Sequence, residues 1–305
     1  MTPKSAQPSI VLPLSAVVRV NKLSRLVVLT FVFALPSMPV RAVDAAGVYS
    51  LVDGDVRALR GATWFRLVAG ARTLEGDVID VGEHAQIQLE LTEGGTLNAQ
   101  GPALMYAMSI PNPEAKSAVG ELMVQHGWVK AAGKGPRPLR IRMPTMTVTL
   151  GDGVVVANCD ARHAEVFIES GTANATSSRG KETPQNVTAG GFVSRNDERT
   201  PIVTNRPPAA FVAALPRQFR DPLPTLANRF PVPPETLVKV GDISLTEAEP
   251  WLVGTNRRTF VRRFTPRLSD PAFRAGVATR PAAFPEWDRV LHPEKYRPKE
   301  TSAAK

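Results

Sequence analysis

Between residues 47 and 195 the chain alternates apolar and polar side chains in short runs. The clearest runs are residues 85–91 (AQIQLEL), 145–150 (TMTVTL) and 164–169 (AEVFIE). A period of two predicts strands with one buried and one solvated face. Glycine and aspartate separate the runs, as at Gly76 and Gly153, where glycine suits the positive φ of tight turns. Because strands recur with almost no helical periodicity, we predict a mainly β body, either an antiparallel sandwich or a β-coil.

The pattern changes after residue 200. Prolines crowd into residues 201–234, and each fixes φ and removes a backbone donor, so neither a long helix nor a central strand can continue there. We predict an extended linker or strap that lies across the β body, anchored by Phe211, Phe219 and Phe230.

Helical signals follow in residues 235–298. Thr246 and Glu249 have the spacing of a capping box, and Asp270 stands before a proline at a second helix start. We predict a small helical appendage packed around five aromatic residues: Trp251, Phe260, Phe264, Phe273 and Trp287. Residues 299–305 are predicted to be a disordered tail.

A ten-residue apolar run, residues 26–35, follows Lys22 and Arg25 and precedes Val-Arg-Ala at 40–42. Basic residues, a short apolar stretch and small residues at −3 and −1 are typical of a secretory signal peptide. We therefore predict that residues 1–42 are an export signal and that Val43 begins the mature chain. An uncleaved anchor and a buried core helix are the alternatives.

This signal predicts a periplasmic protein with no transmembrane anchor after cleavage, because a spanning helix needs about 20 apolar residues. Translation from Val20 instead of Met1 would give a more ordinary signal length. The single cysteine, Cys159, cannot form an intramolecular disulfide, so stability must come from core packing.

The positive charge belongs to the C-terminal third. The whole chain has a net charge of +9, and residues 205–305 carry 17 basic and 10 acidic groups. Outside the cytoplasm such a surface favours an envelope protein or an anionic envelope polymer over nucleic acid. The alternative is an arginine-rich helix face that is merely solvated. The candidate partner-binding residues are Arg257, Arg258, Arg262, Arg263, Arg267, Trp251 and Trp287.

Residues with catalytic or metal-binding chemistry are scattered. The four histidines lack ligand spacing, and nothing near Cys159 and His163 supplies the donors that activate a thiol. No phosphate-binding loop or nucleophile elbow is present. We therefore predict no catalytic residue, no metal, no cofactor and no enzymatic activity.

An ordered series of short motifs runs along the predicted strands. The series comprises residues 47–49 (GVY), 74–79 (LEGDVI), 87–97 (IQLELTEGGTL), 122–129 (LMVQHGWV), 139–149 (LRIRMPTMTVT), 166–171 (VFIESG) and 187–191 (VTAGG). By this ordered series the chain resembles the FecR-type periplasmic domain. The resemblance spans residues 47–195, within a predicted domain of residues 43–200. It implies a jelly-roll-like or β-helical sandwich used for protein contact or signal relay rather than catalysis.

The resemblance is incomplete in two places. The family's Gly-Thr-x-Phe element is missing around residues 153–156. Its cytoplasmic region, which regulates a sigma factor, has no counterpart among the residues before the export signal. We therefore do not expect direct sigma-factor regulation.

These observations predict a non-enzymatic, exported cell-envelope protein that binds a protein or polymer and relays a signal. Exposed sheet edges and the cationic face are the expected contact surfaces. One alternative is a peptidoglycan- or glycan-binding protein that uses surface tryptophans (Trp64, Trp128, Trp251 or Trp287). An extracytoplasmic hydrolase with an unrecognised site is the less favoured alternative.

Overall fold

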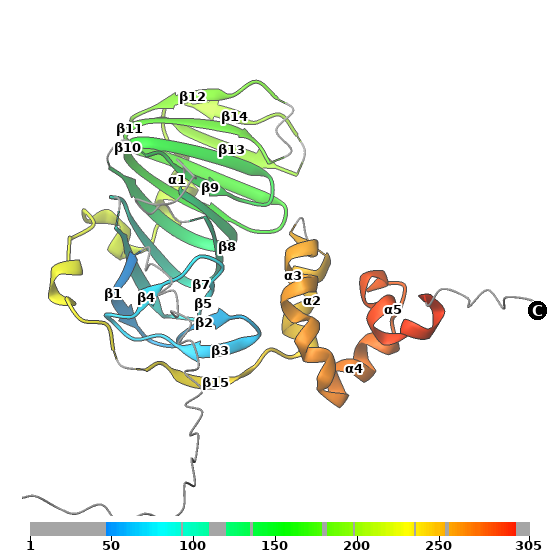
Figure 1. Ribbon diagram of the computed structural model, residues 1–305. Coiled ribbons are helices and arrows are strands. Elements are labelled where there is room, and N and C mark those ends of the chain that lie inside the picture. Colours follow the sequence, from blue (N-terminus) through cyan, green and yellow to red (C-terminus); the bar gives the residue numbers. More distant parts are fainter. Residues whose placement is uncertain are drawn as a thin grey trace, which may run out of the picture. The chain divides into compact units, whose positions relative to one another are not determined.

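The structure, a computed structural model, describes residues 47–92, 94–109, 120–134, 137–178, 182–197, 199–234, 236–253 and 256–296 (Figure 1). The predicted export signal and the predicted C-terminal tail lie outside these residues. Within them, no helix is both long enough and apolar enough to cross a lipid bilayer.

The mainly β prediction is confirmed, because the described strands form one hydrogen-bonded sheet. The strands are β1 (Gly47–Asp53), β2 (Val56–Arg60), β3 (Thr63–Arg66), β4 (Arg72–Thr73), β5 (Val78–Val81), β6 (Gln86–Leu91), β7 (Thr96–Ser109), β8 (Gly120–Gly133), β9 (Leu139–Arg142), β10 (Met146–Cys159), β11 (His163–Ser177), β12 (Gln185–Thr188), β13 (Phe192–Asn196), β14 (Ile202–Thr204) and β15 (Val238–Asp242).

The main strand order is β14-β13-β11-β10-β9-β8-β7-β5-β2-β3-β15. Outside this order, β6 pairs with β7 and with β1, and β4 pairs with β1. Each described pairing is antiparallel except that of β8 with β9, which is parallel. The sheet is therefore mixed rather than purely antiparallel, and β14 and β15 are the two ends of its main order.

Alternate residues of the strands build one apolar core. Tyr49 of β1, Ile87 of β6, Val129 of β8 and Val166 of β11 all belong to it and are buried. Since side chains alternate across a strand, the residues between these core positions face the other side of the sheet. That second face carries polar residues and is the one that matters for the site.

The long strands β10 and β11 approach each other closely where they bend. The pairing register shifts between Leu150 and Gly153, and Gly153 lies opposite Gly171. A Cβ on Gly153, whose φ is 151°, would lie 2.4 Å from the Ser170 carbonyl oxygen. The bend therefore requires glycine at this position.

Helices occur after β14. They are α1 (Ala209–Ala214), η1 (Arg217–Arg220), η2 (Ala227–Arg229), α2 (Leu245–Val253), α3 (Arg257–Phe264), η3 (Thr265–Ser269), α4 (Pro271–Ala278), α5 (Pro285–Leu291) and η4 (Pro293–Tyr296), with η denoting 3₁₀-helix. Residues 238–242, within the segment predicted to be helical, instead form β15 and pair with β3. Asp270 caps α4 as predicted, accepting hydrogen bonds from the Ala272 and Phe273 N–H groups.

The capping box of α2 differs from the predicted pair. The Ser244 N–H donates to Glu247 at 3.0 Å, and the Glu247 N–H donates back to the Ser244 hydroxyl at 3.3 Å. The helix thus begins two residues earlier than the Thr246–Glu249 spacing indicated, and Pro250 lies inside it.

The residues after β15 share an apolar cluster with the β body. Leu59 of β2, Trp64 of β3 and Tyr106 of β7 join the predicted aromatic residues in this cluster. The Tyr106 and Phe260 rings are 5.0 Å apart. The helices therefore pack on strands that are more than a hundred residues away in sequence.

Candidate binding groove beside the proline-rich strap

The strap, residues 205–234, lies against the polar face of the sheet. Its first half is held by apolar contacts: the Phe211 ring lies 5.1 Å from the Trp128 and Phe192 rings. Phe219 is also buried in this cluster. The aromatic anchoring expected from sequence is thus present at Phe211 and Phe219, and Phe230 lies close to Gly70.

A row of polar side chains crosses three neighbouring strands under the strap. Gln88 of β6 lies opposite Asn98 of β7, which lies opposite Lys130 of β8. The neighbours of each along its strand are core residues, so the three side chains share the opposite face. All three are buried. We call Gln88, Asn98 and Lys130 the polar row.

Lys130 is the one charged member of the row and, like Gln88, is 1% exposed. Its ammonium group donates to the carbonyl oxygens of Phe219 at 2.8 Å and Asp221 at 2.9 Å. It also pairs with the Glu169 carboxylate at 2.7 Å, and 1% of its side chain is exposed. A buried ammonium is stable only with such partners, so Lys130 fixes the strap to the sheet.

Three more side chains hold the second half of the strap. Gln88 donates to the Pro224 carbonyl at 2.7 Å. Glu90 accepts from the N–H groups of Leu226 at 2.7 Å and Ala227 at 3.1 Å. Arg72 donates to the Phe230 carbonyl at 2.9 Å and more distantly to that of Pro231. Every one of these contacts is made to the strap's main chain.

The hydrogen bonds to Glu90 change its acidity. Burial by itself would raise the pKa of this carboxyl, but hydrogen bonds from Ser50, Leu226, Ala227 and Gln88 together outweigh burial and lower the pKa. Glu90 is therefore ionised at neutral pH, as its role as acceptor for two strap N–H groups requires.

This lowered pKa makes the seating of the strap pH-dependent. A carboxylate whose pKa is lower in the folded state than in the unfolded state stabilises the fold fully at pH values above its unfolded pKa, about 4.3. This stabilisation is lost as the pH falls through the pKa of the folded state. We expect hydrogen-exchange protection at Leu226 and Ala227 to fall at acid pH. Glu90→Gln should show low protection at neutral pH and at every lower pH. A Glu90→Gln variant whose protection at pH 7 equals that of the native protein would contradict the role of Glu90.

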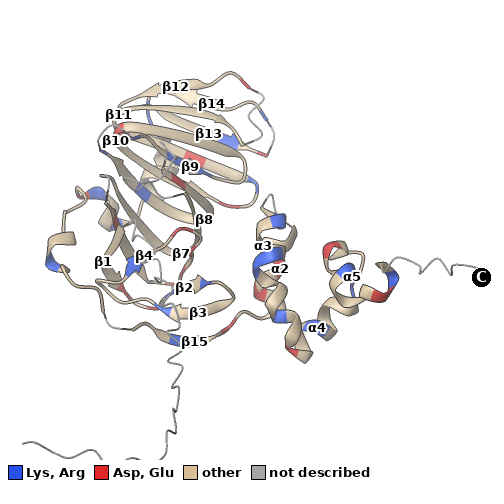
Figure 2. Cartoon of the chain, in the orientation of Figure 1, with Lys and Arg blue, Asp and Glu red and all other residues tan. Residues whose placement is uncertain are grey.

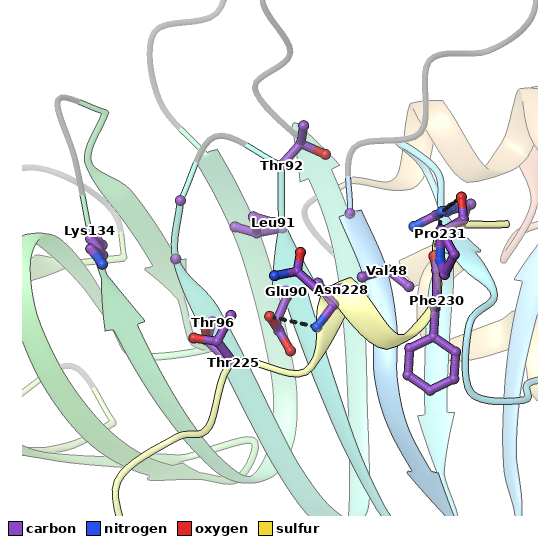
Figure 3. A pocket seen from close by; sticks show the side chains of 15 residues that line it. Val48, Glu90, Leu91, Thr92, Thr96, Lys134, Thr225, Asn228, Phe230 and Pro231 are labelled. Atoms are coloured by element: carbon purple, nitrogen blue, oxygen red, sulfur yellow. Dashed lines mark hydrogen bonds between the residues drawn. The ribbon is translucent and has the colours of Figure 1, made fainter. Parts of the chain in front are cut away.

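A groove of about 750 Å³ opens between the strap and the ends of the strands. In Figure 3, Lys134 lies at one end of the view and Phe230 and Pro231 lie at the other, with Glu90 between them. Lys134 is exposed. The polar residues that line the groove include Arg72, Glu90, Thr96, Lys134, Thr225 and Asn228. The groove is thus lined by two cations, the Glu90 carboxylate and several neutral hydrogen-bonding groups.

Three of the four predicted tryptophans are buried. Trp64 is buried, Trp251 is 3% exposed and Trp287 is fully buried, and the Trp287 indole N–H donates to the Thr265 hydroxyl at 3.1 Å. Trp128 is half-buried and packs on Phe211. Trp64, Trp251 and Trp287 are therefore parts of the apolar core and offer no stacking platform for a sugar ring.

The five predicted arginines divide into two groups. Arg257 pairs with Glu286 at 2.5 Å, Arg267 donates to the Ile243 carbonyl at 3.0 Å, and Arg263 points inward. Arg258 and Arg262 are exposed. Figure 2 shows basic and acidic residues interspersed over the helices. Of the predicted face, Arg258 and Arg262 are thus the two that point to solvent.

Arg263 joins the helices to the β body. Its guanidinium donates to the carbonyls of Leu59, Gly61 and Gly76, and burial lowers its pKa, although arginine remains charged at neutral pH. A planar fork is needed to reach three carbonyls at once.

We expect Arg263→Lys to lower the free energy of unfolding by about 2 kcal/mol, because the ammonium keeps the charge but cannot reach all three carbonyls. Urea denaturation would measure this change. The matched control is Arg262→Lys on the same helix, where the exposed side chain predicts a change below about 0.5 kcal/mol. Equal effects of the two substitutions would contradict the assigned role.

The other reactive groups do not gather into a site. Burial raises the pKa of the Cys159 thiol to about 12, so it is protonated at neutral pH. No group of three His, Cys, Asp or Glu residues has metal-binding geometry within the described ranges. The groove and its anchors are therefore the most developed polar site that the structure shows.

Sequence reasoning did not single out Gln88, Glu90 or Lys130. The signal was present, since all three are polar residues within strand patterns, at positions that alternation assigns to the wet face. What covers that face is decided by residues 219–227, and no local pattern connects these residues to the strands.

Comparisons with known proteins give a limited result. No family model matches the chain, and no curated protein matches it. Two crystal structures of a candidate anti-sigma factor from Parabacteroides distasonis, at 1.65 Å and 2.50 Å resolution, are similar to it with 13% sequence identity and a TM-score of 0.36. Each alignment covers 42% of this chain and 59% of that protein's chain.

Proposed function

We propose that this chain is a non-enzymatic, exported protein of the cell envelope that binds an extended segment of a partner protein in the groove beside the strap. Its β body is proposed to be a FecR-type domain, on the ordered motifs described above. Signal relay, which that resemblance implies, is the proposed consequence of binding.

One observation carries the proposal: the groove of about 750 Å³ beside the strap. Its volume falls in the range that binding sites commonly have. Its elongated lining of backbone, threonine, asparagine and two cations suits a chain molecule better than a compact one. Because the adjoining sheet already binds a polypeptide backbone through Gln88, Glu90 and Lys130, a protein segment is the favoured ligand.

A glycan ligand is the competing candidate, and the structure gives it less support. Its expected recognition elements were surface tryptophans, and Trp64, Trp251 and Trp287 are buried. Binding of the protein to purified peptidoglycan sacculi is therefore an outcome that the test below distinguishes.

The test is photo-crosslinking in envelope extract, with a crosslinking amino acid at Thr96 in the groove. We expect capture of one protein partner, reduced at least tenfold by Lys134→Glu or by Asn228→Trp, which fills the groove from an exposed strap position. Lys239→Glu is the matched control, because Lys239 is also an exposed lysine and does not line the groove.

Two results would refute the proposal. Capture that is equal in the groove variants and the native protein would show that the groove is not the site. Retention on purified sacculi, lost in Lys134→Glu, would assign the groove to a glycan instead. Cell fractionation tests export separately, and an intact precursor in the cytosol would contradict it.

A further inference from the structure

The sheet recognises the main chain of the strap rather than its side chains. Lys130 binds the carbonyls of Phe219 and Asp221, Gln88 binds that of Pro224, and Glu90 binds two successive N–H groups. Main-chain recognition does not depend on sequence, so the same side chains can hold any extended segment with groups at this spacing.

The second half of the strap contributes little apolar burial. None of residues 221–234 is buried, whereas Phe211 and Phe219 in the first half are. The hydrophobic effect, which scales with the apolar area removed from water, therefore favours seating of the first half. Residues 221–231 are held chiefly by the hydrogen bonds to Gln88, Glu90, Lys130 and Arg72.

The strap also leaves one member of the polar row unsatisfied. Asn98 is 7% exposed, and among the described residues no donor reaches its side-chain carbonyl oxygen. Asn98 lies between Lys130, which binds Asp221, and Gln88, which binds Pro224. The strap therefore passes Asn98 at residues 222–223.

Proline removes two of the three backbone N–H donors at residues 222–224. Pro222 and Pro224 have no N–H, so the strap offers few donors where Asn98 needs one. A buried acceptor without a donor is unfavourable. The resident segment is thus an imperfect match to the face that it covers, and an extended segment without these prolines would match the face better.

We propose that the polar row, together with Glu90, is a docking face for an extended segment of a partner protein, and that strap residues 221–231 are its displaceable resident occupant. The partner segment presents carbonyls to Lys130 and Gln88, an N–H to Asn98 and two successive N–H groups to Glu90. It lacks proline at the position facing Asn98. This docking proposal deepens the proposed function. It rests on that function in one respect, namely that the partner is a protein.

Glu90 gives the face a direct link to the groove. It lines the groove (Figure 3), and it also accepts hydrogen bonds from the N–H groups of Leu226 and Ala227. A segment bound in the groove therefore lies beside a residue that fastens the strap.

The test uses the full chain and two fluorescent peptides. One has the sequence of residues 217–231, and the other carries Pro222→Ala and Pro224→Ala. Ala227→Pro in the chain removes one N–H donor to Glu90 and loosens the resident strap. By fluorescence anisotropy, we expect the alanine peptide to bind this variant at least tenfold more tightly than it binds the native chain. We also expect it to bind at least tenfold more tightly than the proline peptide.

Two substitutions locate the binding. Glu90→Gln should weaken binding of both peptides about tenfold, whereas Asn98→Leu should remove only the preference for the alanine peptide. Because proline pre-organises an extended chain, loss of proline would weaken binding if no N–H were used. A preference for the proline peptide, or binding that ignores Glu90 and Asn98, would overturn the proposal.

A second measurement covers the case in which Ala227→Pro unfolds. In the native protein, excess alanine peptide should raise hydrogen exchange at Leu226 and Ala227, and unchanged exchange contradicts displacement. A concentration-dependent dimer of the Ala227→Pro variant would identify the occupant as a second copy of this chain and overturn the partner assignment.

The two proposals fail independently. Lys134→Glu and Asn228→Trp alter the groove and leave the peptide-binding row intact. Partner capture that survives Lys134→Glu and Asn228→Trp, while the peptides still bind, would refute the groove. Partner capture that these variants reduce, in a chain that binds neither peptide, would refute the docking face.

Discussion

Replacing Lys130 by methionine is expected to lower the free energy of unfolding by about 3 kcal/mol. Methionine preserves most of the side-chain volume but leaves the carbonyls of Phe219 and Asp221 without their donor. Glu169 also loses its cation, although this carboxylate is 37% exposed and can be rehydrated. Urea denaturation gives the stability, and limited proteolysis within the strap reports its release.

The control for this substitution is Lys239→Met. Lys239, like Lys130, pairs with a carboxylate, that of Asp242, but 58% of the Lys239 side chain is exposed. Exposed ion pairs contribute about 0–1 kcal/mol. A strap that stays resistant to protease in Lys130→Met would show that the buried ammonium does not anchor it.

Replacing Trp287 by alanine is expected to have the largest effect, a loss of about 4 kcal/mol. Trp287 is fully buried, its ring lies 5.9 Å from Phe273 and 5.6 Å from Phe284, and its indole N–H is hydrogen-bonded. The cavity left behind cannot be filled by one neighbouring side chain. Urea denaturation followed by far-UV circular dichroism measures the loss.

Two further variants on the same helix separate the causes. Trp287→Phe keeps a ring but loses the hydrogen bond, and should cost about 2 kcal/mol. Val290→Ala, at a position that is 45% exposed, should cost less than about 0.5 kcal/mol. A native-like stability of Trp287→Ala would show that the indole is exposed, as a partner contact requires, and is not packed in the apolar cluster.

The predicted contact arginines show what a local sequence pattern does not distinguish. Arginines on one stretch of helix indicated a cationic face, but Arg263 reaches three carbonyls, the one at Leu59 being 204 residues away. Nothing in a local pattern distinguishes an arginine that meets solvent from one that meets a distant carbonyl. The exposed Arg258 and Arg262 lie on the same helix.

The helix starts make the same point on a smaller scale. Asp270 was predicted correctly, because an aspartate followed by proline is a strong local signal. The α2 start was placed two residues late, because Ser244–Glu247 and Thr246–Glu249 both have capping spacing. Residues 238–242 form a strand because β3 offers them an edge, which is again a non-local cause.

The amino-acid sequence was sufficient to predict the strand-rich body, because the alternation of apolar and polar residues is a local property of the chain. It also determined that residues 205–234 could be neither a long helix nor a central strand, since proline acts where it stands. The tertiary structure alone decided which polar face is covered. Glu90 and Leu226 are 136 residues apart. Only folding brings the Glu90 carboxylate to the N–H groups that lower its pKa, and the same carboxylate lines the groove.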